Sequence, residues 1–423
     1  METYGKILLI AMPAFLVLVL LEKWYGIFRH NDTVRNLDMI SSLSSGLTNV
    51  TKDVLGLTIG LLSYDWMVKH WALIHIESSI WIYVIAFFAL DFMGYWVHRI
   101  QHKINFFWNA HLVHHSSEEF NLACALRQSI SSIVKLFTIF LLPAALLGVP
   151  GKVIAIVAPL HLFAQFWYHT RHIGKMGILE YIIVTPAHHR VHHAINPEYI
   201  DKNFSQIFIF WDFLFGTFQE ERADITPVYG ITRPASTWNP IKINFMHVAL
   251  LIKDAWRTQN WKDKLRIWFM PTGWRPKDVS EKYPIQKITD VYHFTKYDTP
   301  ATTGLSVWIW FQITLLLLLI SYFFGNIAGI GSPGIFLYGG YVFIYIYAYT
   351  ELMDRNPKAW LWELLKALYA GVILIQTGDW FQLSQWIPGI VGIMAVYHVA
   401  AVFVSYWFSA KRDLANQLEV SRN

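Results

Sequence analysis

The chain has 423 residues, of which 55% are hydrophobic and only 15% are charged. Soluble proteins carry about 25% charged residues, so these totals exclude an ordinary soluble protein and predict an all-α integral membrane protein with several spans. The net charge of +5 is too small to indicate a nucleic-acid partner, and the single cysteine, Cys124, excludes a disulfide framework and any multi-cysteine zinc or iron–sulfur site.

Apolar runs in the first part of the chain predict the first spans. Residues 7–21 lack an A-x-A-like cleavage site and are expected to form a retained span rather than a removed signal peptide. A weaker run lies at about residues 45–64, and a strong run, 81–97, leads directly into the first histidines. Residues 130–149 and 153–168 are separated by glycine and proline, which predicts a helical hairpin that crosses the membrane and returns.

Residues 171–300 contain no run that is apolar enough to span a membrane. Aromatic and basic residues interleave in WDFLFGTF and WKDKLRIWFM, which predicts a cap of amphipathic helices at the membrane surface. Apolar runs resume at about 305–324, 335–349, 359–376 and 387–408. The predicted organisation is therefore a helical bundle with two parts: residues 1–300 form a membrane domain with a histidine-rich cap, and residues 301–423 form C-terminal transmembrane helices.

Lysine and arginine residues lie mostly in the polar connections between the apolar runs. Such residues mark the loops that stay on the cytoplasmic side of a membrane. We therefore expect the cap and its site to face the cytoplasm, in a bacterial inner membrane or the endoplasmic reticulum. The sequence gives no indication of the oligomeric state.

Histidines are concentrated in one region, since twelve of the eighteen fall between residues 98 and 193. His98 and His102 are four residues apart, and two H-x-x-H-H motifs follow. Positions three and four apart share one face of a helix, so each cluster can direct several imidazoles at one point. Eight imidazoles are too many for one ion and suit a di-metal site. The two motifs are His111, His114 and His115, and His189, His192 and His193.

A fourth element lies between these motifs. His161, Gln165 and His169 follow one another at four-residue spacing, so they share a helix face. His169 is predicted where this segment leaves the membrane, near the last motif, and is expected to be a ninth ligand. His161 lies deeper, and either His161 or Gln165 could be a ligand, a partner of a bound water or a lining residue.

Several neighbours are candidates for supporting roles. His172 and His188 are expected to be supporting or surface groups rather than ligands, and Asp91, seven residues before His98, could orient an imidazole or pair with a cation. The other histidines, which are isolated, are expected to be ordinary hydrogen-bonded residues. Polar residues beside the clusters could orient ligands or bind a lipid head group, with solvated or capping roles equally open: Glu118, Asn121, Arg127, Asp201 and Asn203.

The histidine pattern excludes several kinds of metal site. The chain has no H-E-x-x-H motif of a hydrolytic zinc site and no Glu-x-x-His of a carboxylate-bridged di-iron bundle. Haem ligation in a membrane would need histidines in the middle of facing spans, whereas most of these lie near predicted helix ends. Imidazole binds iron, copper and zinc alike, so the residues alone leave the metal open.

The succession H-x-x-x-H, H-x-x-H-H and H-x-x-H-H resembles that of the fatty acid hydroxylase/sterol desaturase superfamily of membrane di-iron oxygenases. The stretches HHSSEEFNLACALRQS, TPAHHRVHHAINPEYIDKNF, YGITRP and DRNPKAWLWELLKAL are most similar to the branch that cleaves alkylglycerol ether lipids with tetrahydrobiopterin. The similarity extends over nearly the whole chain, including the spans after residue 300.

This resemblance implies two iron ions, O2 as the oxidant and a reduced pterin or another electron donor. It implies a membrane lipid substrate that is hydroxylated at the carbon bearing the ether oxygen, giving a fatty aldehyde and a glycerol derivative. The implied iron ligands are His98, His102, His111, His114, His115, His169, His189, His192 and His193. The sequence departs from relatives at Lys103 and Gln165, and tetrahydrobiopterin rests on the resemblance alone because no pterin-binding motif is present.

Two alternatives remain open from the sequence. The same centre could hydroxylate or desaturate another lipid, such as a sterol, a fatty acyl chain or an aminolipid. A histidine-rich metal transporter is the more distant alternative, because transport would place ionisable residues in several spans. The runs after residue 300 contain almost none, apart from Glu363 and Lys366.

Overall fold

The computed structural model describes residues 2–74, 79–132, 134–135 and 137–420. Five of its helices are long and apolar enough to cross a membrane by length and composition, so the predicted all-α membrane fold is confirmed. These helices are α1 (Glu2–Phe28), α4 (Ile80–Lys103), α13 (Thr303–Gly325), α16 (Ala359–Thr377) and α17 (Ile390–Val420). The strands β1 (Ile59–Gly60) and β2 (Val134–Lys135) form a short parallel pair.

The other helices are shorter or more polar. In the membrane part they are α2 (Asn36–Val54), α3 (Tyr64–Trp71), α5 (Asn105–His115), α6 (Leu142–Leu146), α7 (Gly151–Phe163), α14 (Ile327–Ile330) and α15 (Gly334–Met353). In the predicted cap they are α8 (Pro186–His193), α9 (Phe210–Leu214), α10 (Pro240–Arg257), α11 (Trp261–Arg266) and α12 (Lys277–Lys282). None of the five candidate spans lies in 171–300, as the sequence predicted.

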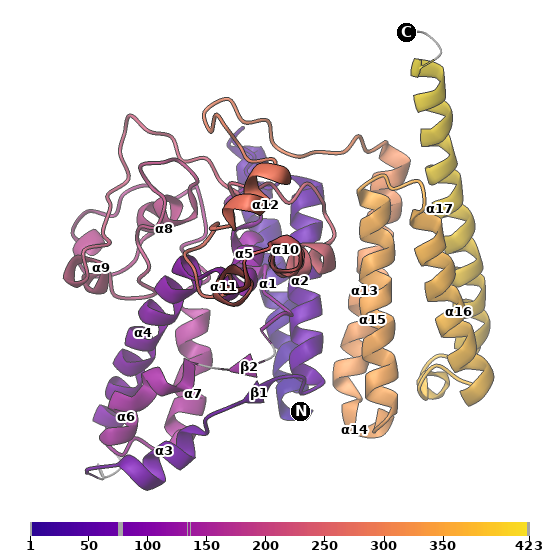
Figure 1. The fold of residues 1–423 in the computed structure, drawn as a ribbon. Helices are drawn as coiled ribbons and strands as arrows, with labels where there is room; N and C mark the ends of the chain where they lie inside the picture. The colour runs from indigo at the N-terminus through magenta and orange to yellow at the C-terminus, as the bar shows by residue number, and fades with distance from the viewer. Residues whose placement is uncertain (1, 75–78, 133, 136, 421–423) are drawn as a thin grey trace.

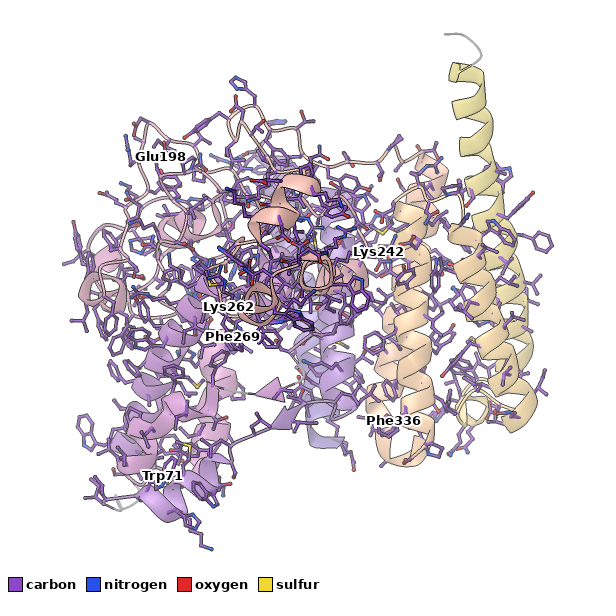
Figure 2. All side chains as sticks on the ribbon, in the orientation of Figure 1. Trp71, Glu198, Lys242, Lys262, Phe269 and Phe336 are labelled. Atoms are coloured by element: carbon purple, nitrogen blue, oxygen red, sulfur yellow. The ribbon has the colours of Figure 1, made fainter. Side chains whose placement is uncertain are left out.

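The cap covers one end of the spans. Figure 1 shows α8 beyond the C-terminal end of α4, where the histidines begin, with α9 to the left of it and α12 above α10. Figure 2 shows Glu198 in the cap, whereas Trp71 on α3 and Phe336 on α15 lie at the opposite end of the molecule. The cap therefore closes the helical bundle on one side only, the side that carries the histidines.

A polar network is buried between the helices after residue 300. Lys366 Nζ lies 2.6 Å from Glu363 Oε2 and donates to the Tyr397 hydroxyl at 2.9 Å. Gln312 on α13 donates to Glu363 Oε1 at 3.0 Å, and the Tyr345 hydroxyl donates to Gln312 Oε1 at 2.7 Å. The two ionisable residues that the sequence showed in α16 are thus partnered by side chains of α13, α15 and α17, as expected for charges held among spans.

Replacing Tyr397 by phenylalanine should weaken this part of the bundle. The substitution removes one hydroxyl that accepts from Lys366 and bonds to Tyr345 and Gln312. We expect the free energy of unfolding to fall by about 1–2 kcal/mol, since a buried group would lose its partner. Unfolding of the detergent-solubilised protein measures this, with Tyr406→Phe on the exposed face of α17 as the control; equal stability of both variants would contradict the expectation.

The predicted hairpin at residues 130–168 is wrong in its lengths. The first run does not form one helix: it contains β2, a short 3-10 turn at Phe137–Leu141 and α6. The second forms only α7, whose 13 residues span about 20 Å, less than the roughly 30 Å of a bilayer core. Proline explains part of this, because Pro143 begins α6 and Pro159 lies inside α7.

Two other predicted spans also differ from the structure. The weak run at 45–64 does not form its own span: its first part is the second half of α2, which is largely buried against α15 and other helices, and the helix ends at Val54. The run at 335–349 forms α15, which is long enough but does not meet the hydropathy of a candidate span. Its tyrosines lower the hydropathy and fill the core, where Tyr338, Tyr341, Tyr345 and Tyr349 are fully buried.

The cap and the C-terminal helices are directly connected through α10. Lys242 on α10 forms an ion pair with Glu351 on α15, and Figure 2 shows Lys242 on the side of α10 that faces these helices. Asn239, which caps α10, also donates to Glu351 at 2.8 Å. The division of the chain into two domains at residue 300 stays a prediction. Across this boundary, α13 packs against α1, and α15 packs against α2.

Candidate metal centre

Nine histidines from four parts of the chain converge in two groups where α4 meets the cap. In each group the nitrogens that could bind an ion all lie within 4.8 Å of one another. The first group, called the five-histidine group, contains His98, His102, His111, His115 and His192. The second, the four-histidine group, contains His114, His169, His189 and His193. These are the nine residues named from the sequence; their role as ligands remains a prediction.

Helix geometry explains how one motif serves both groups. His111 and His115 are four residues apart on α5 and join the five-histidine group, whereas His114 points to the other group. On α8 the division is reversed, because His189 and His193 join the four-histidine group and His192 the five-histidine group. Adjacent helical residues point about 100° apart, so each H-x-x-H-H motif reaches two neighbouring points. The two groups are therefore interleaved.

The distances inside each group fit a shared cation. Neighbouring Nε2 atoms lie 2.9–3.2 Å apart in the five-histidine group. The corresponding distances are 2.9–3.3 Å in the four-histidine group. Two imidazole nitrogens at right angles on one ion, each at about 2.1 Å, would lie about 3.0 Å apart. Both groups match this spacing.

Backbone carbonyls assign the proton on three of these imidazoles. Nδ1 of His98 lies 2.8 Å from the Phe204 carbonyl oxygen, and Nδ1 of His192 lies 2.9 Å from that of Lys202. In the second group, Nδ1 of His169 lies 3.0 Å from the Gln165 carbonyl oxygen. A carbonyl only accepts, so Nδ1 carries the hydrogen and Nε2 presents a lone pair.

Burial keeps these imidazoles neutral. It lowers the pKa of His114 to about 3, and it lowers the pKa values of His189 and His193 well below the ordinary value. Neighbouring imidazoles act in the same direction, because a second positive charge there is unfavourable. In His98, His192 and His169 the Nε2 lone pair is directed at a neighbouring imidazole nitrogen 2.9–3.1 Å away, where a cation between the rings would be stabilised. The donor set therefore fits two transition-metal ions.

The structure gives Asp91, His161 and Gln165 a common role outside the two groups. His161 Nε2 lies 3.0 Å from Asp91 Oδ1, and Gln165 Nε2 lies 3.1 Å from His161 Nδ1. Asp91 also accepts from the backbone of Ile207 and Phe208 at 2.9 and 3.1 Å. The two roles left open for Asp91 were to orient a ligand imidazole or to pair with a cation. The imidazole that it contacts is that of His161, which belongs to neither group, so the role of Asp91 stays a prediction.

His172 and His188 also lie outside the two groups, as the sequence suggested. His172 Nε2 lies 3.2 Å from the Thr33 hydroxyl, and its ring packs against Tyr25. His188 belongs to the N-terminal capping box of α8, in which its backbone N–H donates to the Thr185 hydroxyl. The cap fixes the start of α8 and so the direction of the histidines that follow.

Among the five polar candidates, Asp201 lies closest to a group. Its Oδ1 is 3.6 Å from Nδ1 of His102, and its Oδ2 accepts from Lys103 at 2.6 Å. The ion pair with Lys103 explains how a basic residue is accommodated after the second histidine of the first motif. Asn203 contacts α8 rather than a histidine ring: it donates to the backbone carbonyl of His188, the residue before His189, at 3.1 Å.

The other three polar candidates hold loops together, and one of them, Arg127, also lies beside His114 of the four-histidine group through its backbone. Glu118 accepts from the backbone N–H of Tyr297 at 2.5 Å, and Asn121 donates to the Thr33 carbonyl at 2.8 Å. Arg127 is buried and donates to Asp38 at 2.7 Å. These contacts fix the loop that follows the first H-x-x-H-H motif.

Two parts of the site could not be predicted from the sequence. The carbonyls of Phe204 and Lys202 are backbone groups, so no residue pattern could identify them. Asp212 fixes one of them, because it accepts from the backbone of Phe204 and Ser205 at 2.8 and 2.9 Å. The sequence shows Asp212 only as one acidic residue inside the aromatic stretch WDFLFGTF.

A cavity of about 320 Å³ adjoins the five-histidine group. His102, His115, His192 and His193 line it on one side, together with Asp201. Trp108, Leu112, Ile231 and Leu251 add apolar surface, and the cationic side chains Arg233, Arg275 and Lys287 also line it. A pocket of mixed polarity beside the candidate metal centre can hold part of a small molecule.

Comparison with known proteins places this arrangement in context. Residues 83–217, which carry all nine histidines, match the fatty acid hydroxylase family. The chain is 32% identical over 405 residues to alkylglycerol monooxygenase of Homo sapiens, covering 94% of this chain and 87% of the human protein. It is 33% identical to alkylglycerol monooxygenase of Xenopus tropicalis, covering 84% and 79%.

A further match covers only part of the chain. The chain is 31% identical over 151 residues to ornithine lipid hydroxylase OlsE of Rhizobium tropici, covering 35% of this chain and 45% of that protein. No solved structure matches the chain.

Proposed function

Because the chain belongs to the alkylglycerol monooxygenase family, we propose that it cleaves the ether bond of an alkylglycerol lipid in a membrane. One oxygen atom of O2 enters the alkyl carbon that bears the ether oxygen, and the other leaves as water with two electrons and two protons from a donor. The hemiacetal that results breaks its bond to the glycerol oxygen. The products are a fatty aldehyde and a glycerol derivative.

Two iron ions would occupy the two histidine groups. The support is the convergence of nine imidazoles in two groups, in each of which the candidate ligand nitrogens lie within 4.8 Å of one another, together with family membership. The choice of iron rests on the family, since imidazole also suits copper and zinc. When bound, iron supplies the activation of O2 for insertion into an unactivated C–H bond. The carbonyls of Phe204, Lys202 and Gln165 hold three of the imidazoles in the tautomer that such ions require.

The electron donor would be reduced tetrahydrobiopterin, and the cap would face the cytoplasm, where such a donor is available. The donor rests on the resemblance to the ether-lipid-cleaving branch. The orientation rests on the lysine and arginine residues of the connecting segments. A centre at the end of the spans suits a substrate whose tail lies among apolar helices while its head group meets the cap.

Hydroxylation of another lipid is the second candidate. The match to ornithine lipid hydroxylase OlsE of Rhizobium tropici favours an aminolipid, although it covers only part of the chain. The matches to alkylglycerol monooxygenases cover far more of it, so ether cleavage is the first choice.

Turnover by the purified, detergent-solubilised protein tests the proposal. We expect about two iron ions per chain, and one fatty aldehyde released for each O2 consumed when alkylglycerol and reduced tetrahydrobiopterin are supplied together. Omission of either compound should stop aldehyde release. Hydroxylation of ornithine lipid or a sterol without any ether cleavage would contradict it, and so would metal binding without O2 consumption.

A further inference from the structure

The cavity beside the five-histidine group carries more positive charge than the surrounding carboxylates neutralise. Arg275 is paired with Asp254, at 2.5 and 2.9 Å, and Asp201 is paired with Lys103. Within the described part of the chain, neither Arg233 nor Lys287 has a carboxylate partner among the ion pairs. Two cationic groups therefore line the cavity without a counter-ion.

The chain holds these two residues next to each other. The backbone N–H of Ile288 donates to the Thr232 carbonyl at 2.9 Å, so the segment carrying Lys287 runs beside the segment carrying Arg233. Among the described residues, the guanidinium of Arg233 donates to the Met246 carbonyl, at 3.4 Å. Burial and the charge of Arg275 lower the pKa of Arg233, and Asp254, which is already paired with Arg275, opposes this only in part. A partly buried cation of this kind is stabilised by an anionic ligand.

The same cavity is also lined by His102, His115 and His192 of the candidate metal centre. A substrate carbon that is to be oxidised must lie close to that centre. In an ether lipid this carbon is joined through the ether oxygen to glycerol. The glycerol and its substituents must therefore occupy space that adjoins the histidines, and the cavity is such a space.

We propose that Arg233 and Lys287 recognise a phosphate on the glycerol of the ether-lipid substrate, so that the enzyme prefers alkylglycerol phosphates to uncharged alkylglycerols. This inference rests on the proposed ether cleavage and adds the substrate class. Arg233 can offer two parallel N–H groups to two phosphate oxygens, a geometry that matches its planar guanidinium. Lys287 is exposed and supplies a single charge at the outer end, so its contribution is smaller.

Kinetics of the full-length enzyme in detergent test the preference, with 1-O-hexadecylglycerol and its 3-phosphate as substrates. We expect kcat/KM to be about tenfold higher for the phosphate, since a charge-assisted hydrogen bond contributes about this factor. Arg233→Gln should remove the preference mainly by raising KM for the phosphate, and should leave the uncharged substrate within about twofold. Arg233→Lys should keep part of the preference, and Lys287→Gln should reduce it less than Arg233→Gln.

Arg222→Gln is the matched control, because Arg222 is exposed and paired with Asp224 outside the cavity. Equal kcat/KM for both substrates in the unmodified enzyme would overturn the proposal. An equal effect of Arg233→Gln on kcat/KM for the two substrates would also overturn the proposal. If Arg233→Gln instead raised KM for the electron donor, the cavity would be the binding site of the donor, and the proposal would be wrong. Free glycerol 3-phosphate should compete with the lipid and not with the donor.

Binding separates this proposal from the proposed reaction. Calorimetry should show that the solubilised protein binds hexadecylglycerol phosphate more tightly than hexadecylglycerol, and that Arg233→Gln abolishes the difference. If neither lipid is cleaved but this difference in binding is found, the proposed function fails and the anion site stands. If both are cleaved but bind equally, the function stands and the anion site fails.

Discussion

Replacement of His193 by alanine should reduce the metal content from about two ions per chain to about one and lower aldehyde release by about 10³-fold or more. His193 belongs to the four-histidine group, which would keep only three imidazoles. Loss of a metal that activates a reactant removes several kcal/mol of transition-state stabilisation, and about 4 kcal/mol corresponds to that factor.

The same substitution in the other group should affect metal content differently. His115→Ala leaves four imidazoles in the five-histidine group, as many as the intact four-histidine group has. We therefore expect His115→Ala to retain close to two ions while its activity still falls, because the ion loses part of its ligand set. Metal analysis with O2 consumption measures both quantities, and His172→Ala, outside both groups, is the control. Two ions and full activity in His193→Ala would contradict the assignment of this group as a metal site.

Spacing along the sequence predicted most of the histidine arrangement, because imidazoles at i and i+4 share a helix face wherever the helix lies. His98 with His102, and His189 with His193, are brought together in this way. Spacing could not predict how each H-x-x-H-H motif divides between two groups. That division depends on the distance and angle between α5 and α8, which are set by long-range packing.

The fourth element shows where a shared helix face stops being informative. His161, Gln165 and His169 were expected on one face, and only His169 joins a group. α7 ends at Phe163, so the chain turns before His169 and carries it away from His161. His161 instead contacts Asp91 on α4. The spacing of residues along the sequence could not predict this contact between two separate helices.

Hydropathy predicted the spans that face apolar surroundings and failed where helices are short or polar. α4 and α13 follow the predicted runs closely, because long apolar helices leave few alternatives in a membrane. The failures at α7 and α2 have different causes. α7 is short and contains Pro159: Val153 and Val157 pack in a cluster with Ala86 on α4, whereas Leu160, Leu162 and Phe163 are exposed. α2 is largely buried against other helices. Hydropathy cannot distinguish a lipid-facing residue from one in a protein core.

Asp91 lies seven residues before His98 on α4, which is about 10 Å along a helix. It is therefore too deep to contact the imidazoles of the two groups, although it lies on a similar face. Its carboxylate is completely buried and accepts from His161, from the backbone of Ile207 and from the Trp211 indole at 2.9–3.0 Å. The segment that it holds continues to Phe204, whose carbonyl orients His98.

Asp91→Ala should therefore destabilise the protein and weaken the metal centre from a distance. It leaves several buried donors without an acceptor, so we expect the free energy of unfolding to fall by about 3–5 kcal/mol. Since the segment 204–211 would loosen, the metal content of the five-histidine group should also fall, although Asp91 contacts none of its members. Asp91→Asn keeps one acceptor oxygen and should be milder in both respects.

Denaturation of the solubilised protein, together with metal analysis, measures both effects. Asp290→Ala is the control, because Asp290 is an exposed partner of His293. A stable Asp91→Ala protein with two ions would show that the contacts of Asp91 do not support the centre. An unstable variant that still binds two ions would limit Asp91 to a role in packing. Lower stability accompanied by loss of about one ion would establish that the deep carboxylate positions the imidazoles above it.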